Sequence, residues 1–411
     1  MENVSVTPAP VTLAERIGAI DALRGFAVLG ILIMNIQSFS LVGAAYLNPT
    51  AYGDLSGANR WVWIISHIIA DKKFMTIFSM LFGAGIVLMT DRIEARGSGA
   101  RGIHYRRTMW LIVIGLLHAY LLWYGDILFT YGLCALLVYL FRRLSPGKLF
   151  AIGLVSFAIG SITFLFFGYS VPYWPQEAVR NTMGTWRPGL EVVTRELEAF
   201  RSGWLGQLKM RITQSLFLQT FYFLMQAGWR SGGLMLIGMA FYKWDILTGR
   251  RSKRFYAWLV AIGCAVGLPL VIIGVYRNFA AGWSLEYSMF LGSQFNYWGS
   301  VFVSSAFIGA MMLVSTYAMF RRLTGVLAAV GRMALTNYLM QTVICTTVFY
   351  GHGFGLFGRV ERMWHPLIIV AVWIPQLVWS PLWLRHFRFG PAEWLWRTLT
   401  YRKSQPMYVI K

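Results

Sequence analysis

The chain has 411 residues, of which 57% are hydrophobic and 13% are charged. This balance leaves too little polar surface to cover a soluble globule, so most of the surroundings must be lipid. The formal net charge is +21, but the basic residues cluster between hydrophobic segments without a base-stacking motif, which argues against a nucleic-acid partner. The three cysteines lie inside apolar runs and supply neither a disulfide framework nor zinc-ligand spacing, so no metal site is expected.

Apolar runs long enough to cross a bilayer, about 20 residues each, recur along the chain. The first, residues 22–45, lacks a small-residue cleavage site and is expected to remain as a signal anchor. A β-barrel would instead show alternating segments of about ten residues. The sequence therefore predicts an all-α, polytopic integral membrane protein with about ten transmembrane helices. We place them at residues 22–43, 72–90, 108–124, 127–141, 149–170, 217–242, 255–275, 297–320, 326–350 and 364–384.

Lysine and arginine concentrate in alternate short connections between these spans. Those connections are residues 91–107, 142–148, 243–254 and 321–325. Arg16 and Arg24 precede or begin the first span, and further basic residues follow the last one. Because positive charge in short loops marks the cytoplasmic side, both termini are predicted to be cytoplasmic.

The long connection 171–216 carries an apolar stripe at helical spacing, which predicts one amphipathic helix on the outer membrane face. Its members are Leu190, Val193, Leu197, Phe200, Trp204 and Leu208. The helix is interpreted either as a surface-anchored linker or as a lid over an outward-facing cavity. After the last span, Pro391 opens a segment that mixes Trp394 and Trp396 with basic residues, as expected of an interfacial helix on anionic lipid.

Five stretches of the sequence resemble one family, the YeiB-like bacterial inner-membrane proteins. They are Arg16 to Ile36, Phe74 to Gly85 (FMTIFSMLFGAG), Gly115 to Leu128 (GLLHAYLLWYGDIL), Gly331 to Tyr350 (GRMALTNYLMQTVICTTVFY) and Gly390 to Arg397 (GPAEWLWR). The resemblance implies a multi-pass protein of the bacterial cytoplasmic membrane, and the family is one of unassigned function.

A broader likeness joins the first two spans to transmembrane acyltransferases of the heparan-α-glucosaminide N-acetyltransferase kind. The matching positions are Asp21, Arg24, Gly25, Asn35, Ala70, Asp71 and Phe74. Those enzymes carry a catalytic histidine shortly after the asparagine, and residues 37–47 here contain none. With these likenesses the chain divides into an acyltransferase-like membrane half at 1–170, the connection at 171–216 and a YeiB-like membrane half at 217–400.

Asp21 and Arg24 are three residues apart on one helix face at the predicted cytoplasmic boundary. One interpretation is an ion pair that fixes the start of the helix. The other is an inward-facing site in which Arg24 binds the phosphates of an acyl-CoA or an anionic headgroup.

His118 lies ten residues after Thr108 and therefore roughly 15 Å along its predicted span. On a straight helix it could not reach Asp126, eight residues on, so contact requires a helix break at Gly125 or a bridge through Tyr131, water or substrate. His118 is either a buried hydrogen-bonding group between helices or a general base or proton relay.

His67 and Asp71 are four residues apart, on one face of a predicted helix near the outer boundary, and a carboxylate at that spacing can orient an imidazole. Lys72 and Lys73 are expected to compete for Asp71.

In the ninth span, Asn337 and Gln341 belong to a polar strip, interpreted either as interhelical hydrogen bonding or as the wall of a substrate cavity.

That strip also contains Arg332 and Thr336, and Tyr350 and His352 would lie at the outer mouth of such a cavity. Asn35 is a further candidate for lining it.

Three functions fit these residues. The first is acyl transfer from a cytoplasmic donor such as acyl-CoA to a small-molecule or lipid-linked acceptor, with His118 or His67 as the base and Asp126 or Asp71 orienting it. The second is a transporter or channel. The third is a membrane binding protein without turnover. No phosphate-cradle motif for ATP is found in the sequence.

Overall fold

The computed structural model describes residues 17–409, and in this part of the chain every regular element is a helix. One isolated bridge pairs Phe387 with Tyr408. The all-α prediction is therefore confirmed. Arg16, which belongs to the predicted topology signal and to the first family-like stretch, lies outside the described residues.

The helices occupy the following bounds: α1 Gly18–Ser40, α2 Ala44–Leu47, α3 Gly57–Ile69, α4 Lys73–Ala95, α5 Ala100–Leu117, η1 His118–Leu122, α6 Leu128–Val138, η2 Tyr139–Phe141, α7 Pro146–Ser170, η3 Val171–Tyr173, α8 Gln176–Trp186, α9 Leu190–Arg201, α10 Leu208–Phe217, η4 Leu218–Ala227, α11 Gly228–Lys243, α12 Lys253–Ala280, η5 Leu285–Leu291, α13 Ser293–Thr316, η6 Ala318–Phe320, α14 Arg321–Arg332, α15 Ala334–Phe349, η7 Arg362–Trp364, α16 His365–His386 and α17 Pro391–Tyr401.

Six helical segments among the described residues are long and apolar enough to cross a membrane. They are Gly18–Ser40, Gly57–Ala95, Pro146–Tyr173, Lys253–Ala280, Leu285–Thr316 and Arg362–His386. The other four predicted spans correspond to α5 with η1, to α6, to η4 with α11, and to α14 with α15. A polytopic membrane fold is confirmed, and the count of ten crossings stays a prediction.

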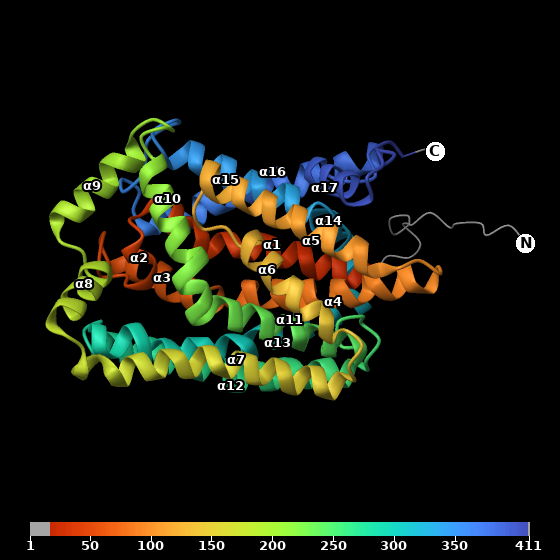
Figure 1. Ribbon diagram of the computed structural model, residues 1–411, viewed down its shortest axis with the longest axis horizontal. Coiled ribbons are helices and arrows are strands. Elements are labelled where there is room, and N and C mark those ends of the chain that lie inside the picture. Colours follow the sequence, from red (N-terminus) through yellow and green to blue (C-terminus); the bar gives the residue numbers. More distant parts are fainter. Residues whose placement is uncertain (1–16, 410–411) are drawn as a thin grey trace, which may run out of the picture.

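The long helices run roughly side by side between two ends of the molecule (Figure 1). The start of α1 and helix α17 lie at one end, here called the α17 end, and α8 and α9 lie at the other, the α9 end. Helices α7, α12 and α13 form one side of the bundle. Helices α1, α4 and α11 carry much of the main buried cluster.

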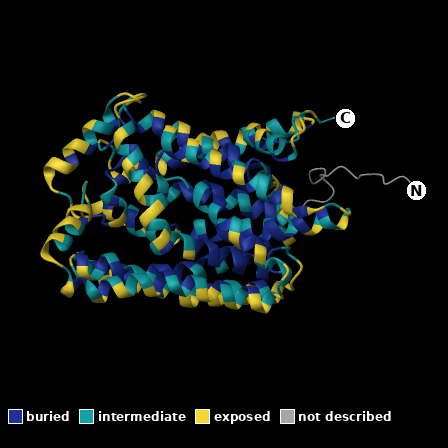
Figure 2. Cartoon of the chain, viewed as in Figure 1, coloured by how far each residue is buried: buried dark blue, intermediate teal, exposed yellow. Residues whose placement is uncertain are grey.

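Burial is asymmetric across the bundle, with the most buried segments inside and exposed residues along α7 and α12 (Figure 2). In the most apolar 18-residue stretches of α7, α12 and α16, only 28%, 28% and 22% of the residues are buried. Exposed side chains on these helices are large and apolar, such as Phe166, Ile262 and Ile374. Apolar side chains on the outside of long helices are expected where lipid is the solvent.

Glycines allow the central helices to approach one another closely. A Cβ atom at Gly331 of α14 would collide with the carbonyl oxygen of Asp21 in α1, and one at Gly83 of α4 with that of Met235 in α11. Helices from both predicted membrane halves therefore share one tightly packed interior.

The predicted helix containing both His67 and Asp71 is interrupted, which corrects the sequence expectation. Helix α3 ends at Ile69 and α4 begins at Lys73, and Lys72 between them has a left-handed backbone with a φ of 64°. Such a backbone is uncommon for a residue with a side chain and ends a helix. Asp71 therefore lies in the break rather than one turn along the same helix.

Two other predicted helices are also divided. The ninth predicted span splits at Met333 into α14 and α15, because the Glu393 carboxylate of α17 accepts hydrogen bonds from the backbone N–H groups of Leu335 and Thr336 and so provides a new helix start. The apolar stripe 190–208 is not one helix, since α9 ends at Arg201 and α10 begins at Leu208.

Helix α9 packs against the protein at the α9 end. Val193 and Phe200 are buried in an apolar cluster with residues of α1 and α15, whereas Leu190 is 82% exposed. The stripe is thus partly used for protein packing.

Candidate functional site

A hydrogen-bonded group of polar side chains lies at the break between α3 and α4. The His67 Nδ1 atom is 3.3 Å from Asp71 Oδ2. Asn296 of α13 donates from Nδ2 to Asp71 Oδ2 at 2.6 Å and accepts at Oδ1 from Lys73 Nζ, also at 2.6 Å. Lys73 Nζ further donates to the His67 carbonyl oxygen at 2.8 Å. Asn296 thus links the lysine to the carboxylate. Both Lys72 and Lys73 interact electrostatically with Asp71, as the sequence led us to expect.

Two more cations surround the same carboxylate. Lys72 and Arg230 of α11 both interact electrostatically with Asp71. Arg230 is 7% exposed, its Nη2 donates to two hydroxyl groups at 2.8 and 2.9 Å, and its buried Nε has no partner. With Lys73, this arrangement sets three cationic side chains around one carboxylate, so positive charge predominates among these four residues.

The His67 imidazole keeps one nitrogen available. Its ring stacks on Trp63 at 4.9 Å between centroids, and Nδ1 faces Asp71. Among residues 17–409, the structure assigns no hydrogen bond to Nε2. The side chains of His67 and Asp71 are 14% and 10% exposed, so the pair is largely buried but remains partly accessible.

His118 and Asp126 also contact one another, although they lie on different elements. Helix α5 passes into the π-helical turn η1 at His118, and the chain then turns back before α6 begins at Leu128. This turn brings His118 Nδ1 to 2.9 Å from Asp126 Oδ1. The break near Gly125, one of the alternatives that the sequence left open, is the geometry that occurs.

The second nitrogen of His118 is engaged as well. Nε2 lies 2.9 Å from the Thr342 hydroxyl of α15, which completes a carboxylate–imidazole–hydroxyl chain between the loop after η1, η1 itself and α15. Asp126 Oδ2 also accepts from the backbone N–H of Phe129 at 2.7 Å. The side chains of His118 and Asp126 are each 1% exposed. In this conformation the group is closed to solvent.

The polar strip of the ninth predicted span forms hydrogen bonds between helices. Asn337 Nδ2 donates to Ser380 of α16 at 3.1 Å, and Gln341 Nε2 donates to Gln376 at 3.1 Å. Gln341 also donates to the Val28 carbonyl oxygen of α1 at 3.2 Å. These contacts join α15 to α1 and α16.

The remaining predicted residues are Tyr350, Asn35, Asp21 and Arg24. Tyr350 is fully buried, and its ring packs 4.8 Å from that of Phe200. Asn35 is half-buried on α1. Arg24 Nη1 lies 2.8 Å from Asp21 Oδ1, with side-chain exposures of 28% and 10%. A donor-binding role for Arg24 stays a prediction.

Sequence reasoning did not assign a role to Asn296, Thr342 or Glu393. Asn296 and Thr342 look like ordinary polar residues of membrane helices, so only the fold reveals their partners. Arg230 carried a detectable signal, because a charged residue inside an apolar segment is costly and commonly functional.

Comparison with known proteins gives consistent results. A family described as "Protein of unknown function (DUF418)" matches residues 241–403. "Uncharacterized protein YeiB" of Escherichia coli K12 is 35% identical, over 95% of this chain and 98% of that protein. "Uncharacterized protein YxaH" of Bacillus subtilis 168 is 30% identical, over 97% of each.

A protein of Bacillus acidopullulyticus, named for its position in the amylase 3' region, is 27% identical over 98% of this chain. The likeness thus extends well beyond the part matched by the family. This polytopic membrane protein belongs to the YeiB-like family of unassigned function.

Proposed function

We propose that the protein transfers an acyl group within the bacterial cytoplasmic membrane, with His67 as general base. The observation that carries the proposal is the state of the His67 ring: Nδ1 faces the Asp71 carboxylate at 3.3 Å, and Nε2 has no hydrogen-bond partner among the described residues. A base needs one nitrogen held and the other free to take a proton. His118 Nε2 already faces the Thr342 hydroxyl at 2.9 Å, and its side chain is 1% exposed, so an acceptor cannot approach that nitrogen in this conformation.

The proposed reaction uses an acyl thioester such as acyl-CoA as donor. An acceptor hydroxyl or amine adds to the thioester carbon while His67 Nε2 takes its proton. The carbon–sulfur bond then breaks, and the proton passes from the imidazolium to the leaving thiolate. Asp71 holds the ring and stabilises its protonated form, and the nearby cations Lys72 and Arg230 favour the negative charge that develops on the carbonyl oxygen.

The test measures free thiol released from acyl-CoA by the full-length protein in lipid nanodiscs. Acetyl-CoA and palmitoyl-CoA serve as donors, with a bacterial lipid extract as acceptor. His67→Gln should lower the release rate by roughly 10²–10⁴-fold, because the general base is removed. His386→Gln, which changes an exposed histidine, is the matched control and should leave the rate unchanged.

Unchanged release from His67→Gln would overturn the role of His67. Absence of release by the unmodified protein with both donors would overturn acyl transfer itself. His118→Gln separates the two histidines, since a larger loss there than in His67→Gln would move the base to the carboxylate–imidazole–hydroxyl chain.

A specific observation favours transport as the second candidate. The α3–α4 segment is broken at charged residues inside the bundle, and interrupted helices with charged groups at the break are typical of ion and substrate sites in transporters. Uptake of a labelled anion into sealed vesicles, without chemical change of the anion, would support this candidate over acyl transfer.

A further inference from the structure

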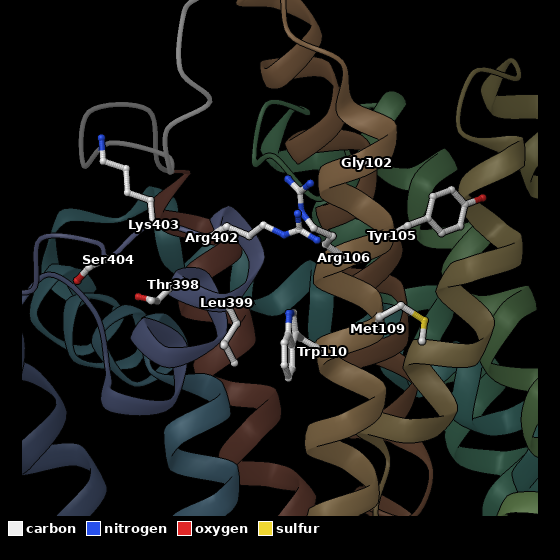
Figure 3. A pocket seen from close by; sticks show the side chains of 10 residues that line it. All are labelled: Gly102, Tyr105, Arg106, Met109, Trp110, Thr398, Leu399, Arg402, Lys403 and Ser404. Carbon is white, nitrogen blue, oxygen red and sulfur yellow. The ribbon is translucent and has the colours of Figure 1, made fainter.

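A groove between α5 and α17 lies at the α17 end of the molecule (Figure 3). Its volume is about 590 Å³. One wall is the first half of α5, and the other is the end of α17 with the residues that follow it. None of the residues at the α3–α4 break lines the groove, and it plays no part in the proposed chemistry.

The groove is strongly basic at its outer rim. Arg106, Arg402 and Lys403 line it, and none of its lining residues is acidic. The side chains of Arg106 and Arg402 point toward one another across it (Figure 3). Two guanidinium groups facing each other repel unless an anion lies between them, so the arrangement favours a bound anion.

These cationic groups are not satisfied by the protein. Arg106 Nε donates to the Thr400 carbonyl oxygen at 3.0 Å, which fixes the side chain, and neither Nη atom has a hydrogen-bond partner among the described residues. No ion pair involving Arg106, Arg402 or Lys403 occurs among residues 17–409. The shielded hydroxyl oxygen of Thr398, which also lines the groove, has no hydrogen-bond partner either.

The other part of the groove is apolar. Trp110 lies one helical turn beyond Arg106 on α5, and Leu399 lies opposite on α17 (Figure 3). The order along the bundle is therefore basic at the α17 end and apolar toward the membrane interior. That order matches one lipid molecule, with a phosphate at the interface and an acyl chain beside it, and it does not match a small inorganic ion.

We propose that this groove binds an anionic phospholipid of the leaflet at the α17 end. The phosphodiester accepts hydrogen bonds from the Arg106 and Arg402 guanidinium groups, Lys403 adds a third positive charge, and an acyl chain lies against Trp110 and Leu399. The planar guanidinium fork suits the two unesterified oxygens of a phosphodiester.

The lipid would act as a clamp between two helices. Glu393 of the same α17 accepts hydrogen bonds at the start of α15, from Leu335 N at 2.7 Å and Thr336 N at 3.0 Å. Holding α17 against α5 therefore supports the start of α15, the helix whose Thr342 hydroxyl contacts His118. Lipid binding in this groove does not depend on whether the protein transfers acyl groups.

The experiment titrates the full-length, detergent-solubilised and delipidated protein with dioleoyl phosphatidylglycerol. Bound lipid is counted by native mass spectrometry, and the melting temperature is followed in parallel. Dioleoyl phosphatidylcholine and inorganic phosphate are the comparison probes. Phosphatidylglycerol should bind and raise the melting temperature, and the other two should not.

Arg106→Gln with Arg402→Gln should weaken phosphatidylglycerol binding at least tenfold. Arg402→Gln with Lys403→Gln changes only exposed side chains, so it keeps the fold and should also weaken binding. The matched control is Arg321→Gln with Arg322→Gln, two exposed arginines of α14 that do not line the groove, which should bind normally.

Equal phosphatidylglycerol affinity in the groove variants and the control would overturn the proposal. Equal binding of phosphatidylcholine would show that charge does not select the lipid and would also overturn it. An equal stabilisation by inorganic phosphate would replace the lipid site with a simple anion site.

Discussion

At the scale of single residues, Glu196 is a carboxyl group buried at the α9 end. It is 8% exposed, and its Oε1 accepts hydrogen bonds from Gly43 N at 2.8 Å and from Gln214 Nε2 at 3.2 Å. Burial raises the pKa of the Glu196 carboxyl above its ordinary value, although the two hydrogen bonds oppose the shift. The side chain fastens α9 to the loop after α1.

This raised pKa gives a signed pH dependence. The folded state binds the proton more tightly than the unfolded chain, so the stability that Glu196 contributes is fully present below its unfolded pKa of about 4.3 and is lost as pH rises through the folded pKa. We expect Glu196→Gln to melt at a higher temperature than the unmodified protein at neutral pH. The difference between the two melting temperatures should shrink as the pH falls toward the unfolded pKa of Glu196.

The substituted amide can keep the local contacts. Its oxygen can accept from Gly43 N, and its new N–H groups can reach the Gln214 Oε1 atom, which is buried without a partner. Glu198→Gln on the same helix is the control, because Glu198 is exposed. Melting curves in detergent between low and neutral pH decide the matter, and parallel curves for all three proteins would contradict the assignment.

Individual site residues could be predicted only in part. Ionisable groups in apolar segments are rare, and this rarity identified His118, with Asp126 as the nearest acid. A spacing of four residues identified His67 with Asp71. Their partners could not be identified, because hydrogen bonds to Asn296 and Thr342 join positions more than two hundred residues apart. Which histidine keeps a free nitrogen follows from tertiary contacts and not from spacing.

At the scale of helices, the crossing of α1 and α14 depends on residues without a side chain. The Cβ atom of an alanine at Gly331 would meet backbone atoms of Asp21 and Gly25, which cannot rotate away. We expect Gly331→Ala to destabilise the folded protein by about 1–3 kcal/mol, because the two helices must separate.

Gly325 offers a matched comparison on the same helix. Nothing lies within 4 Å of a Cβ atom placed there. Gly325→Ala should leave stability unchanged or raise it by up to about 1 kcal/mol through helix propensity. Chemical unfolding in detergent measures both variants. Equal unfolding free energies for Gly331→Ala and Gly325→Ala would show that α1 and α14 can move apart without loss of stability.

Hydropathy located the helices well but not their interruptions. Apolar runs reveal a segment that prefers lipid, and α1, α7 and α12 lie where the runs predicted them. The divisions at Lys72 and Met333 arise from local backbone geometry and from a distant glutamate, and neither changes mean hydropathy. Helix α8 was not predicted, because its residues lie outside the apolar runs.

At the scale of the whole molecule, the apolar outer surface and the basic loops together predict how the protein is oriented in a bilayer. Exposed apolar side chains on α7, α12 and α16 form the lipid-facing surface. The α17 end carries the connections rich in lysine and arginine, and α8 and α9 lie at the opposite end (Figure 1). The positive-inside rule then predicts that the α17 end faces the cytoplasm.

Labelling of single cysteines with a membrane-impermeant maleimide, applied to intact cells, tests this orientation. The three native cysteines are replaced first, and cysteine is then introduced at Gly99, Ser252 or Asn181. Gly99 and Ser252 immediately precede α5 and α12, and Asn181 is in α8.

Asn181→Cys should be labelled in intact cells, and the other two variants should be labelled only after the membrane is opened. The fold alone requires Gly99 and Ser252 to give one result and Asn181 the other, because they lie at opposite ends of the bundle (Figure 1). The basic loops then choose which end is inside. A full exchange of the two results would reverse the orientation and keep the fold, whereas different results for Gly99 and Ser252 would contradict the helix arrangement itself.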